Sequence, residues 1–315
     1  MKQASSGHFS PAALGACAGF LVCWSIGPIY IKLLADSLDV WTQNMARYAT
    51  ACVFWLPFLL LYGRQGLNRS VLKKALIPTA FNLIFQTCWA GSFYFENPAF
   101  MMLLSRTSIL WVILFSLTLF ADERPLVKSP LFWTGAAFSL TGLLGVIVCN
   151  PNFGSATTWT GIALALAASL AWAGYTISVK IVFAHTDSRL SFAIITLYTV
   201  LGLGVLAMLF GTPSTLLDLP PRQISYVVIS AVSSIALAHV FFYAAIRRIG
   251  ATIPSMINLL TPFSVLVLSR IFFGEYLTGG QWVFGIALIT GIALAVRART
   301  YISGSQVPLA PPIED

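Results

Sequence analysis

Long apolar stretches separated by short polar segments run through the whole sequence. A helix needs about 20 apolar residues to cross the hydrocarbon core of a membrane, and the stretches have about that length, with Pro, Gly, Asn or Asp at most of their ends. Strands of a membrane barrel would be about half as long and would alternate apolar and polar residues. The pattern therefore predicts an all-α integral membrane protein. Ten transmembrane helices are expected, at residues 11–32, 40–62, 74–95, 98–120, 130–149, 159–183, 190–210, 223–246, 252–273 and 281–298.

The two halves of this series carry the same landmarks. Trp24 and Lys32 lie eight residues apart, and Trp172 and Lys180 repeat that spacing 148 positions later. A duplication explains the match, and each copy then holds five helices. Because five is an odd number, the second copy crosses the membrane in the opposite direction, as in the inverted repeats of many transporters. We therefore expect a cytoplasmic tail at 1–9, a first repeat at 10–150, an inverted repeat at 151–301 and a disordered cytoplasmic tail at 302–315.

Composition and charge agree with a membrane location. Hydrophobic residues make up 58% of the chain, charged residues 9%, and the mean hydropathy is +0.85, which is too apolar for a soluble protein of this size. If the N-terminus is cytoplasmic, thirteen Lys and Arg lie on the cytoplasmic side and three on the other. The net charge of +8 thus reflects topology and not nucleic-acid binding. We expect a multi-pass protein of the cell membrane, the bacterial inner membrane in particular.

Further landmarks carry a resemblance to a known family. The end of the fourth predicted helix, 119–123, matches 271–275 at an offset of 152, and both segments end in Glu after an aromatic residue. With ten helices in two copies and a Trp in the first helix of each, the chain resembles the drug/metabolite transporter superfamily and its EamA-like exporters over residues 11–298. Arg47-Tyr48 matches the Arg-aromatic pair that is frequent in the second helix of that family, and Pro262 matches a Pro of the ninth.

The resemblance implies a basket of helices around a central cavity and transport by alternating access. Helices 1, 3, 4, 6, 8 and 9 would chiefly line the cavity, with helices 5 and 10 packed behind them. The small multidrug branch of the superfamily uses a buried Glu in its first helix, and this chain departs from it. Its first helix has no acid, and Glu96, Glu123 and Glu275 lie at helix ends, so cationic-drug antiport through a buried carboxylate is disfavoured.

The charges expected inside the membrane are positive. Arg47 and Arg106 lie seven or eight residues into their helices, about 10 to 12 Å deep, where an Arg costs roughly 2.5 to 3.5 kcal/mol unless it faces a cavity or a polar partner. We expect Arg47 to brace helix ends or loop carbonyls. Arg106 either braces the bundle or binds an anionic group such as a carboxylate, and Asn258 is its equivalent at an offset of 152.

Polar and aromatic residues at helical spacing complete the expected site. Asn82, Gln86 and Trp89 follow one stripe of the third helix, and His239 and Tyr243 lie one turn apart on the eighth. The candidate substrate-binding residues are Trp24, Tyr30, Asn82, Gln86, Trp89, Arg106, Trp172, Tyr175, His239, Tyr243 and Asn258. The candidate hinges are Gly27, Pro28 and Pro262, because proline removes a backbone donor.

Such a lining suits a small, partly apolar solute with a carboxylate. The best candidates are aromatic or other hydrophobic amino acids, carried by a secondary exporter. Other organic anions, nucleotide-sugar-like solutes and cationic drugs remain alternatives. An intramembrane enzyme is the rival class, but His239 has no acid partner in a span. We expect no catalytic residues, no metal, no cofactor and no nucleic-acid partner. The partners are a small-molecule substrate and membrane lipid, with the oligomeric state open.

Overall fold

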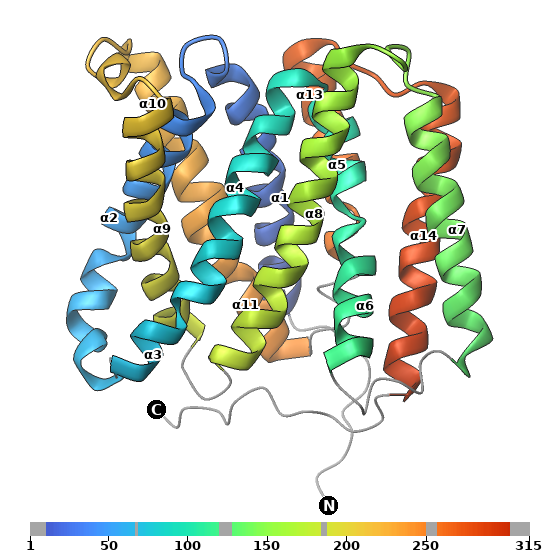
Figure 1. The fold of residues 1–315 in the computed structure, drawn as a ribbon, viewed down its shortest axis with the longest axis horizontal. Coiled ribbons are helices and arrows are strands. Elements are labelled where there is room, and N and C mark those ends of the chain that lie inside the picture. The colour runs from blue at the N-terminus through green and yellow to red at the C-terminus, as the bar shows by residue number, and fades with distance from the viewer. Residues whose placement is uncertain (1–10, 67–68, 120–127, 184–187, 250–256, 303–315) are drawn as a thin grey trace, which may run out of the picture.

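The computed structural model describes residues 11–66, 69–119, 128–183, 188–249 and 257–302. The tails predicted at 1–9 and 302–315 and the loop that holds Glu123 lie outside these ranges, apart from Ile302. All regular elements in the described ranges are helical, and the long helices run side by side between two ends of one bundle (Figure 1). We call these ends the Pro11 end and the Leu34 end, after the first and last residues of α1. The predicted all-α membrane fold is confirmed.

The helices follow the predicted spans closely. The first repeat contains α1 (Pro11–Leu34), α2 (Val40–Gly66), the short α3 (Arg69–Lys74), α4 (Leu76–Phe95), α5 (Pro98–Ser105), α6 (Ser108–Leu119) and α7 (Pro130–Val148). The second contains α8 (Ala156–Val182), α9 (Ser188–Phe210), the 3-10 turn η2 (Pro213–Leu216), α10 (Pro221–Ser230), the π-helical η3 (Ala231–Leu237), α11 (Ala238–Ile249), α13 (Thr261–Phe273) and α14 (Gly279–Ile302).

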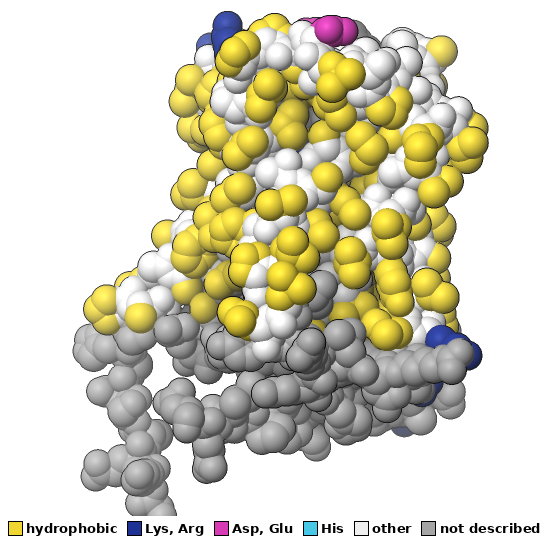
Figure 2. All heavy atoms as spheres, turned by 90° about the vertical axis from the view of Figure 1, so that its left-hand side faces the viewer, with side chains coloured by type: hydrophobic (Ala, Val, Ile, Leu, Met, Phe, Trp, Pro, Cys, Tyr) yellow, Lys and Arg dark blue, Asp and Glu magenta, His cyan; other side chains and the backbone are white. Residues whose placement is uncertain are grey.

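Length and hydropathy fit a membrane protein of about ten spans. Six segments of the described chain are long and apolar enough to cross a membrane, counting α5 with α6 and α10 with η3 and the start of α11. The apolar parts of α13 and α14 are shorter, and α2 and α4 are long but less apolar. Large hydrophobic side chains such as Val53, Leu201 and Met208 are exposed. Figure 2 shows hydrophobic side chains over the flank of the bundle and charged side chains near its two ends. This surface suits lipid and not water.

Sequence-local signals start and stop several helices. The Asn97 side chain accepts a hydrogen bond from the Phe100 amide at 2.8 Å, and Pro98 follows it, which together define the start of α5. Ser155 caps α8 in the same way, by accepting from the Thr158 amide. Gly274 ends α13 with a left-handed φ of 66°, a conformation that glycine adopts without strain.

Helix pairing reflects the inverted duplication. Counted as spans, α2 packs against α9 (2 with 7), α5 against α13 (4 with 9), and α7 against α14 (5 with 10), so each of these spans pairs with its own counterpart. The remaining two pairs, α4 with α8 (3 with 6) and α1 with α11 (1 with 8), exchange with one another when the halves are exchanged. A two-fold relation between two five-helix repeats produces this set of pairs.

The pair α7 and α14 packs backbone against backbone at one edge of the bundle (Figure 1). A Cβ atom added to Gly142 would lie 2.3 Å from the Leu288 amide nitrogen, and one added to Gly291 would lie 2.4 Å from the Ser139 amide nitrogen. Small residues permit such close approach between membrane helices. Gly142 and Gly291 lie 149 positions apart, at equivalent places in the two repeats, and each faces the helix that carries the other. The resemblance implied that these two spans pack behind the cavity, and their place at the edge agrees with it.

The carboxylate of Asp39 joins the two repeats at the Leu34 end. Its oxygens accept hydrogen bonds from the amide and hydroxyl of Thr42 at 2.9 and 2.7 Å, which start α2. They also accept from the amide and hydroxyl of Thr212, both at 2.9 Å, in the loop after α9. Partial burial raises the pKa of Asp39, but these four bonds outweigh it and hold the pKa below its ordinary value of 3.8.

We predict that Gly142→Ala destabilises the protein, by about 1 to 3 kcal/mol, because the new methyl group meets the backbone of α14, which cannot move aside as a side chain would. Gly15→Ala is the matched control, since a Cβ there meets nothing within 4 Å and alanine favours the helix. Thermal unfolding of the purified protein in detergent measures both. Equal melting temperatures for the two variants would contradict the close packing.

We predict that Asp39→Asn lowers the melting temperature at pH 7. Because the pKa of Asp39 is lower in the folded than in the unfolded protein, its stabilisation is complete above about pH 4 and is lost as the pH falls through the folded pKa. The difference from wild type should therefore shrink in acid. Asp36→Asn is the control, because Asp36 lies exposed in the same loop. A difference that stays constant from pH 7 to pH 3 would argue against this role.

Candidate functional site

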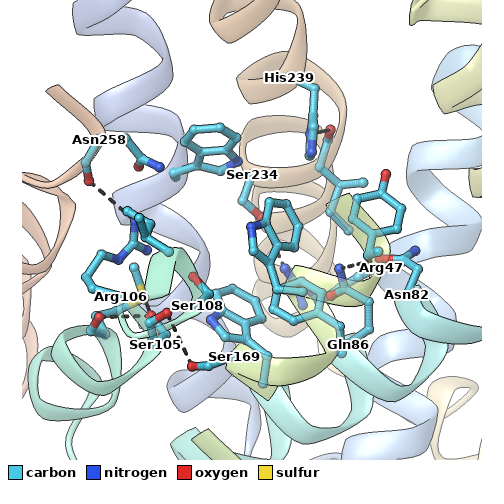
Figure 3. A pocket seen from close by; sticks show the side chains of 18 of the residues that line it. Arg47, Asn82, Gln86, Ser105, Arg106, Ser108, Ser169, Ser234, His239 and Asn258 are labelled. Atoms are coloured by element: carbon cyan, nitrogen blue, oxygen red, sulfur yellow. Dashed lines mark hydrogen bonds between the residues drawn. The ribbon is translucent and has the colours of Figure 1, made fainter. Parts of the chain in front are cut away.

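A cavity in the middle of the bundle is lined by residues from both repeats. It contains about 980 Å³ of space free of atoms, counting the part that opens to solvent. Its lining joins rings, hydroxyls and amides with two guanidinium groups (Figure 3). The lining residues are Trp24, Arg47, Tyr48, Asn82, Phe85, Gln86, Trp89, Met102, Ser105, Arg106, Ser108, Ile109, Ser169, Trp172, Tyr175, Phe192, Ser234, Ile235, His239 and Asn258.

Nine of the eleven candidate binding residues lie in this lining. They are Trp24, Asn82, Gln86, Trp89, Arg106, Trp172, Tyr175, His239 and Asn258. Tyr30 is not among them, because its ring packs edge-on against the ring of Tyr226 on α10 with the centroids 5.2 Å apart. Tyr243 belongs to α11, but its side chain lies outside the described part of the structure.

The fourth span is interrupted at the cavity, a feature that the apolar stretch at 98–120 did not indicate. α5 ends at Ser105 and α6 starts at Ser108, and the amides of Arg106 and Thr107 bond back three residues, to Leu103 and Leu104. That tight winding replaces the ordinary four-residue step of an α-helix. Pro98–Leu119 still forms one span, as predicted at 98–120, and the break within it puts Arg106 at the cavity wall.

The ninth span is broken at the equivalent place. Ile257 and Asn258 are helical, Leu259 and Leu260 form a turn, and α13 starts at Thr261. Pro262, a candidate hinge, thus lies at a helix start, where a residue without an amide hydrogen fits. The breaks face each other, since the Arg106 guanidinium donates through Nη1 to the Asn258 carbonyl at 3.4 Å (Figure 3).

Hydroxyl groups occupy the carbonyls near the end of α5. The Ser105 and Thr107 hydroxyls donate to the carbonyls of Met102 and Leu104, both at 2.8 Å. Ser169 on α8 adds a longer bond of 3.3 Å to the Ser105 carbonyl. Inside a membrane such carbonyls need partners from the protein, and these hydroxyls supply them. The serines were missed as cavity residues, although Ser169 lies one turn before Trp172 on the same helix.

Arg47 joins the second span to the eighth. It is 1% exposed, and it donates through Nε to the Ser230 hydroxyl at 2.7 Å and through Nη2 to the Ser234 hydroxyl at 3.1 Å. Ser230 ends α10 and Ser234 lies in the π-helical segment η3. We expected Arg47 to brace helix ends or loop carbonyls. It does brace two helices, but through hydroxyl groups, and it also lines the cavity.

Both guanidinium groups keep a nitrogen without a hydrogen-bond partner. Arg47 Nη1 and Arg106 Nε are buried, and no described atom accepts from them. The acidic residues of the sequence lie outside the predicted spans, so no carboxylate faces either group in the described lining. Figure 3 places Arg47 and Arg106 on different sides of the cavity. The described lining therefore carries two positive charges, and each guanidinium group keeps one buried nitrogen without an acceptor.

The apolar wall consists of packed rings. Phe85 lies between Trp172 and Trp89, with ring centroids 4.7 and 5.9 Å away. Across the cavity the Trp24 ring meets the His239 ring edge-on at 5.6 Å, and Phe192 stacks on His239 at 4.4 Å. These contacts with Trp24 and Phe192 hold the His239 ring in the wall, together with the Ile235 carbonyl oxygen, which lies 2.8 Å from Nδ1.

Two spans contribute to the lining that the resemblance had not included. The second span adds Arg47 and Tyr48, and the seventh adds Phe192. The stripe of Asn82 and Gln86 also contains Phe85, three residues after the first, so helical spacing could have found it. Nothing in the sequence singles out Phe192, which is one of many phenylalanines in apolar stretches.

Gly27, a candidate hinge, allows a close approach between two helices. A Cβ atom there would lie 2.9 Å from the Ser234 Cβ atom, so α1 and η3 touch beside the cavity. Pro28 follows inside an unbroken α1. The glycine thus holds the Trp24 helix against the segment that binds Arg47.

Comparison with known proteins assigns the chain to a family. The profile of the EamA-like transporter family matches residues 12–148 and matches again at residues 159–297. The chain belongs to the EamA-like transporter family. Each match covers one five-span half, so the EamA-like unit occurs twice, as the repeated landmarks predicted. The chain is therefore a multi-pass membrane protein of a transporter family.

One solved structure, described as "Crystal structure of protein", shares the EamA-like fold. It matches with a TM-score of 0.62 and 16% sequence identity, over 93% of this chain and 99% of its own. At that identity the likeness shows the fold alone. Among curated proteins no sequence matches.

Proposed function

We propose that this protein is a secondary exporter of small solutes that carry a carboxylate and an apolar body, aromatic or other hydrophobic amino acids in particular. One observation carries the proposal. Two buried guanidinium groups with unused donors, Arg47 and Arg106, line the same cavity as the tryptophans. A carboxylate accepts charge-assisted hydrogen bonds from guanidinium groups, and the rings provide contact area for an apolar side chain.

The composition of the lining supports this class of solute. Trp24, Trp89, Trp172 and Phe85 form a wall on which a ring can stack, while Arg106 and Asn258 provide a polar corner at the helix breaks. A larger anion with several phosphates would call for more cationic residues than the two in the described lining. The proposal includes a bacterial inner membrane location with cytoplasmic termini, which the excess of Lys and Arg at the Pro11 end supports.

The proposal also includes alternating access, with the two broken spans as pivots. A helix break concentrates backbone freedom at a few residues, and both breaks border the cavity, at Arg106–Thr107 and Leu259–Leu260. Gly27 and Pro28 provide a third point of bending in α1, where the proline removes a backbone donor.

We predict that a cysteine pair with one member on α13 and the other on its neighbour α5 crosslinks to an extent that depends on substrate. The reason is that the turn before Thr261 interrupts the helix, so α13 would pivot there in the proposed cycle. Crosslinking yields with and without phenylalanine measure the movement, and pairs placed between α7 and α14 are the control. If substrate changes the yield of the test pair no more than that of the control pair, the pivot is contradicted.

We predict that proteoliposomes containing the protein move labelled Phe, Tyr or Trp, and that Arg106→Gln weakens the apparent affinity by about ten- to a hundredfold. The loss follows from removal of hydrogen bonds to a charged group, worth roughly 1.5 to 3 kcal/mol. Arg222→Gln is the control, because Arg222 lies exposed at the Leu34 end and contacts Tyr226. Fluxes equal to those of empty liposomes for all three amino acids would overturn the amino-acid assignment.

A further inference from the structure

The charge balance of the cavity points beyond amino acids. An amino acid brings both a carboxylate and an ammonium group into the site. Arg47 and Arg106 supply donors for the carboxylate. For the ammonium the described lining supplies no carboxylate, and the sequence has no acidic residue in any predicted span. The site is therefore complementary to one half of an amino acid.

Three amide oxygens around the cavity already accept hydrogen bonds from protein donors. The Asn258 carbonyl accepts from Arg106, and the Asn258 side-chain oxygen accepts from the Thr261 hydroxyl at 2.8 Å. The Asn82 side-chain oxygen accepts from Gln86 at 3.4 Å. An ammonium group would have to compete for these oxygens, and a charged group that leaves water without new partners loses affinity.

Free carbonyls hold cations in other broken membrane helices, but at the Arg106–Thr107 break three carbonyls already have partners. The carbonyls of Met102, Leu104 and Ser105 accept hydrogen bonds from serine and threonine hydroxyls. What remains unused at this break is a donor, Arg106 Nε. Ring faces attract a cation, but here they share the cavity with two guanidinium groups, which repel it.

We propose that the cavity recognises the carboxylate and the ring, that the α-ammonium group is dispensable, and that arylalkyl monocarboxylates without an amino group bind more tightly than the amino acids of the same shape. The inference rests on the proposed function, because it concerns the same site. It narrows the substrate class from zwitterions to organic monoanions with an aromatic body.

Four probes with the same phenyl ring and chain test this at pH 7. They are 3-phenylpropionate (an anion), L-phenylalanine (a zwitterion), phenethylamine (a cation) and 3-phenylpropanamide (neutral), titrated calorimetrically into the full-length protein in detergent. We expect 3-phenylpropionate to bind roughly tenfold more tightly than phenylalanine. It has no ammonium group, so no loss of ammonium hydration opposes its binding. The amide should bind more weakly than the anion, and the cation not measurably.

Variants connect the preference to the two guanidinium groups. Arg106→Gln and Arg47→Gln should each reduce the ratio of anion to amide affinity, whereas Arg222→Gln, exposed at the Leu34 end, should leave it unchanged. If Arg47→Gln does not fold, Arg106→Gln and the wild-type series still decide. A ratio that stays unchanged in Arg106→Gln would overturn the assignment of the anion site.

The remaining outcomes separate this inference from the proposed function. Binding of phenylalanine without binding of 3-phenylpropionate, or with a tenfold preference for phenylalanine, would overturn the inference and leave the proposed function standing. Binding of 3-phenylpropionate alone would support the inference and remove the amino acids from the proposed function. Binding of none of the four probes would overturn both.

Discussion

Inside the hydrocarbon core of a membrane, each backbone or side-chain polar group must find its hydrogen-bond partner within the protein, because neither lipid nor bulk water supplies one. This constraint explains why the described chain is helical and why its one interrupted span in the first repeat is surrounded by hydroxyl groups. Ser105, Thr107 and Ser169 occupy carbonyls that an intact helix would have bonded itself. These partners stabilise the break by satisfying its carbonyls. The break in turn brings Arg106 to the cavity.

The same constraint shapes the contact between the two repeats. Arg106 and Asn258 are equivalent positions, and in a perfectly symmetric protein two identical groups would meet there. Two arginines would repel one another, and two asparagines would leave Arg47 as the one positive charge of the described lining. The difference between the repeats lets a guanidinium donate to the carbonyl of its counterpart and still keep Nε unused. Divergence after duplication has therefore produced both the contact and the charge of the site.

Much of the fold was predictable because membrane spans have a strong sequence signal. Apolar length and the residues at span ends predicted the helices. The odd number of helices in each copy predicted the inversion of the second. Helical spacing brought Asn82, Gln86 and Trp89 to one wall. The break at Arg106–Thr107 left no such signal, since the position equivalent to Pro262 is Leu110 and the interruption depends on hydroxyls from Ser169 on another helix. Tyr30 lies outside the described lining, and its spacing along the helix does not reveal which neighbour its ring meets, here Tyr226.

Buried positive charge has a consequence for selectivity. Arg47 spends two of its nitrogens on Ser230 and Ser234, so its position is set by the packing of α2 against α10 and η3 before any solute arrives. A donor held in this way does not lose conformational freedom when it binds an anion, which favours binding. Ser230 and Ser234 satisfy two of its nitrogens but do not neutralise its charge. Under the proposed function, a solute with a net negative charge would compensate that charge most fully. A zwitterion would compensate it less, because its ammonium group cancels part of the field that the carboxylate feels. Under the proposed function, net charge would thus contribute to discrimination as much as shape.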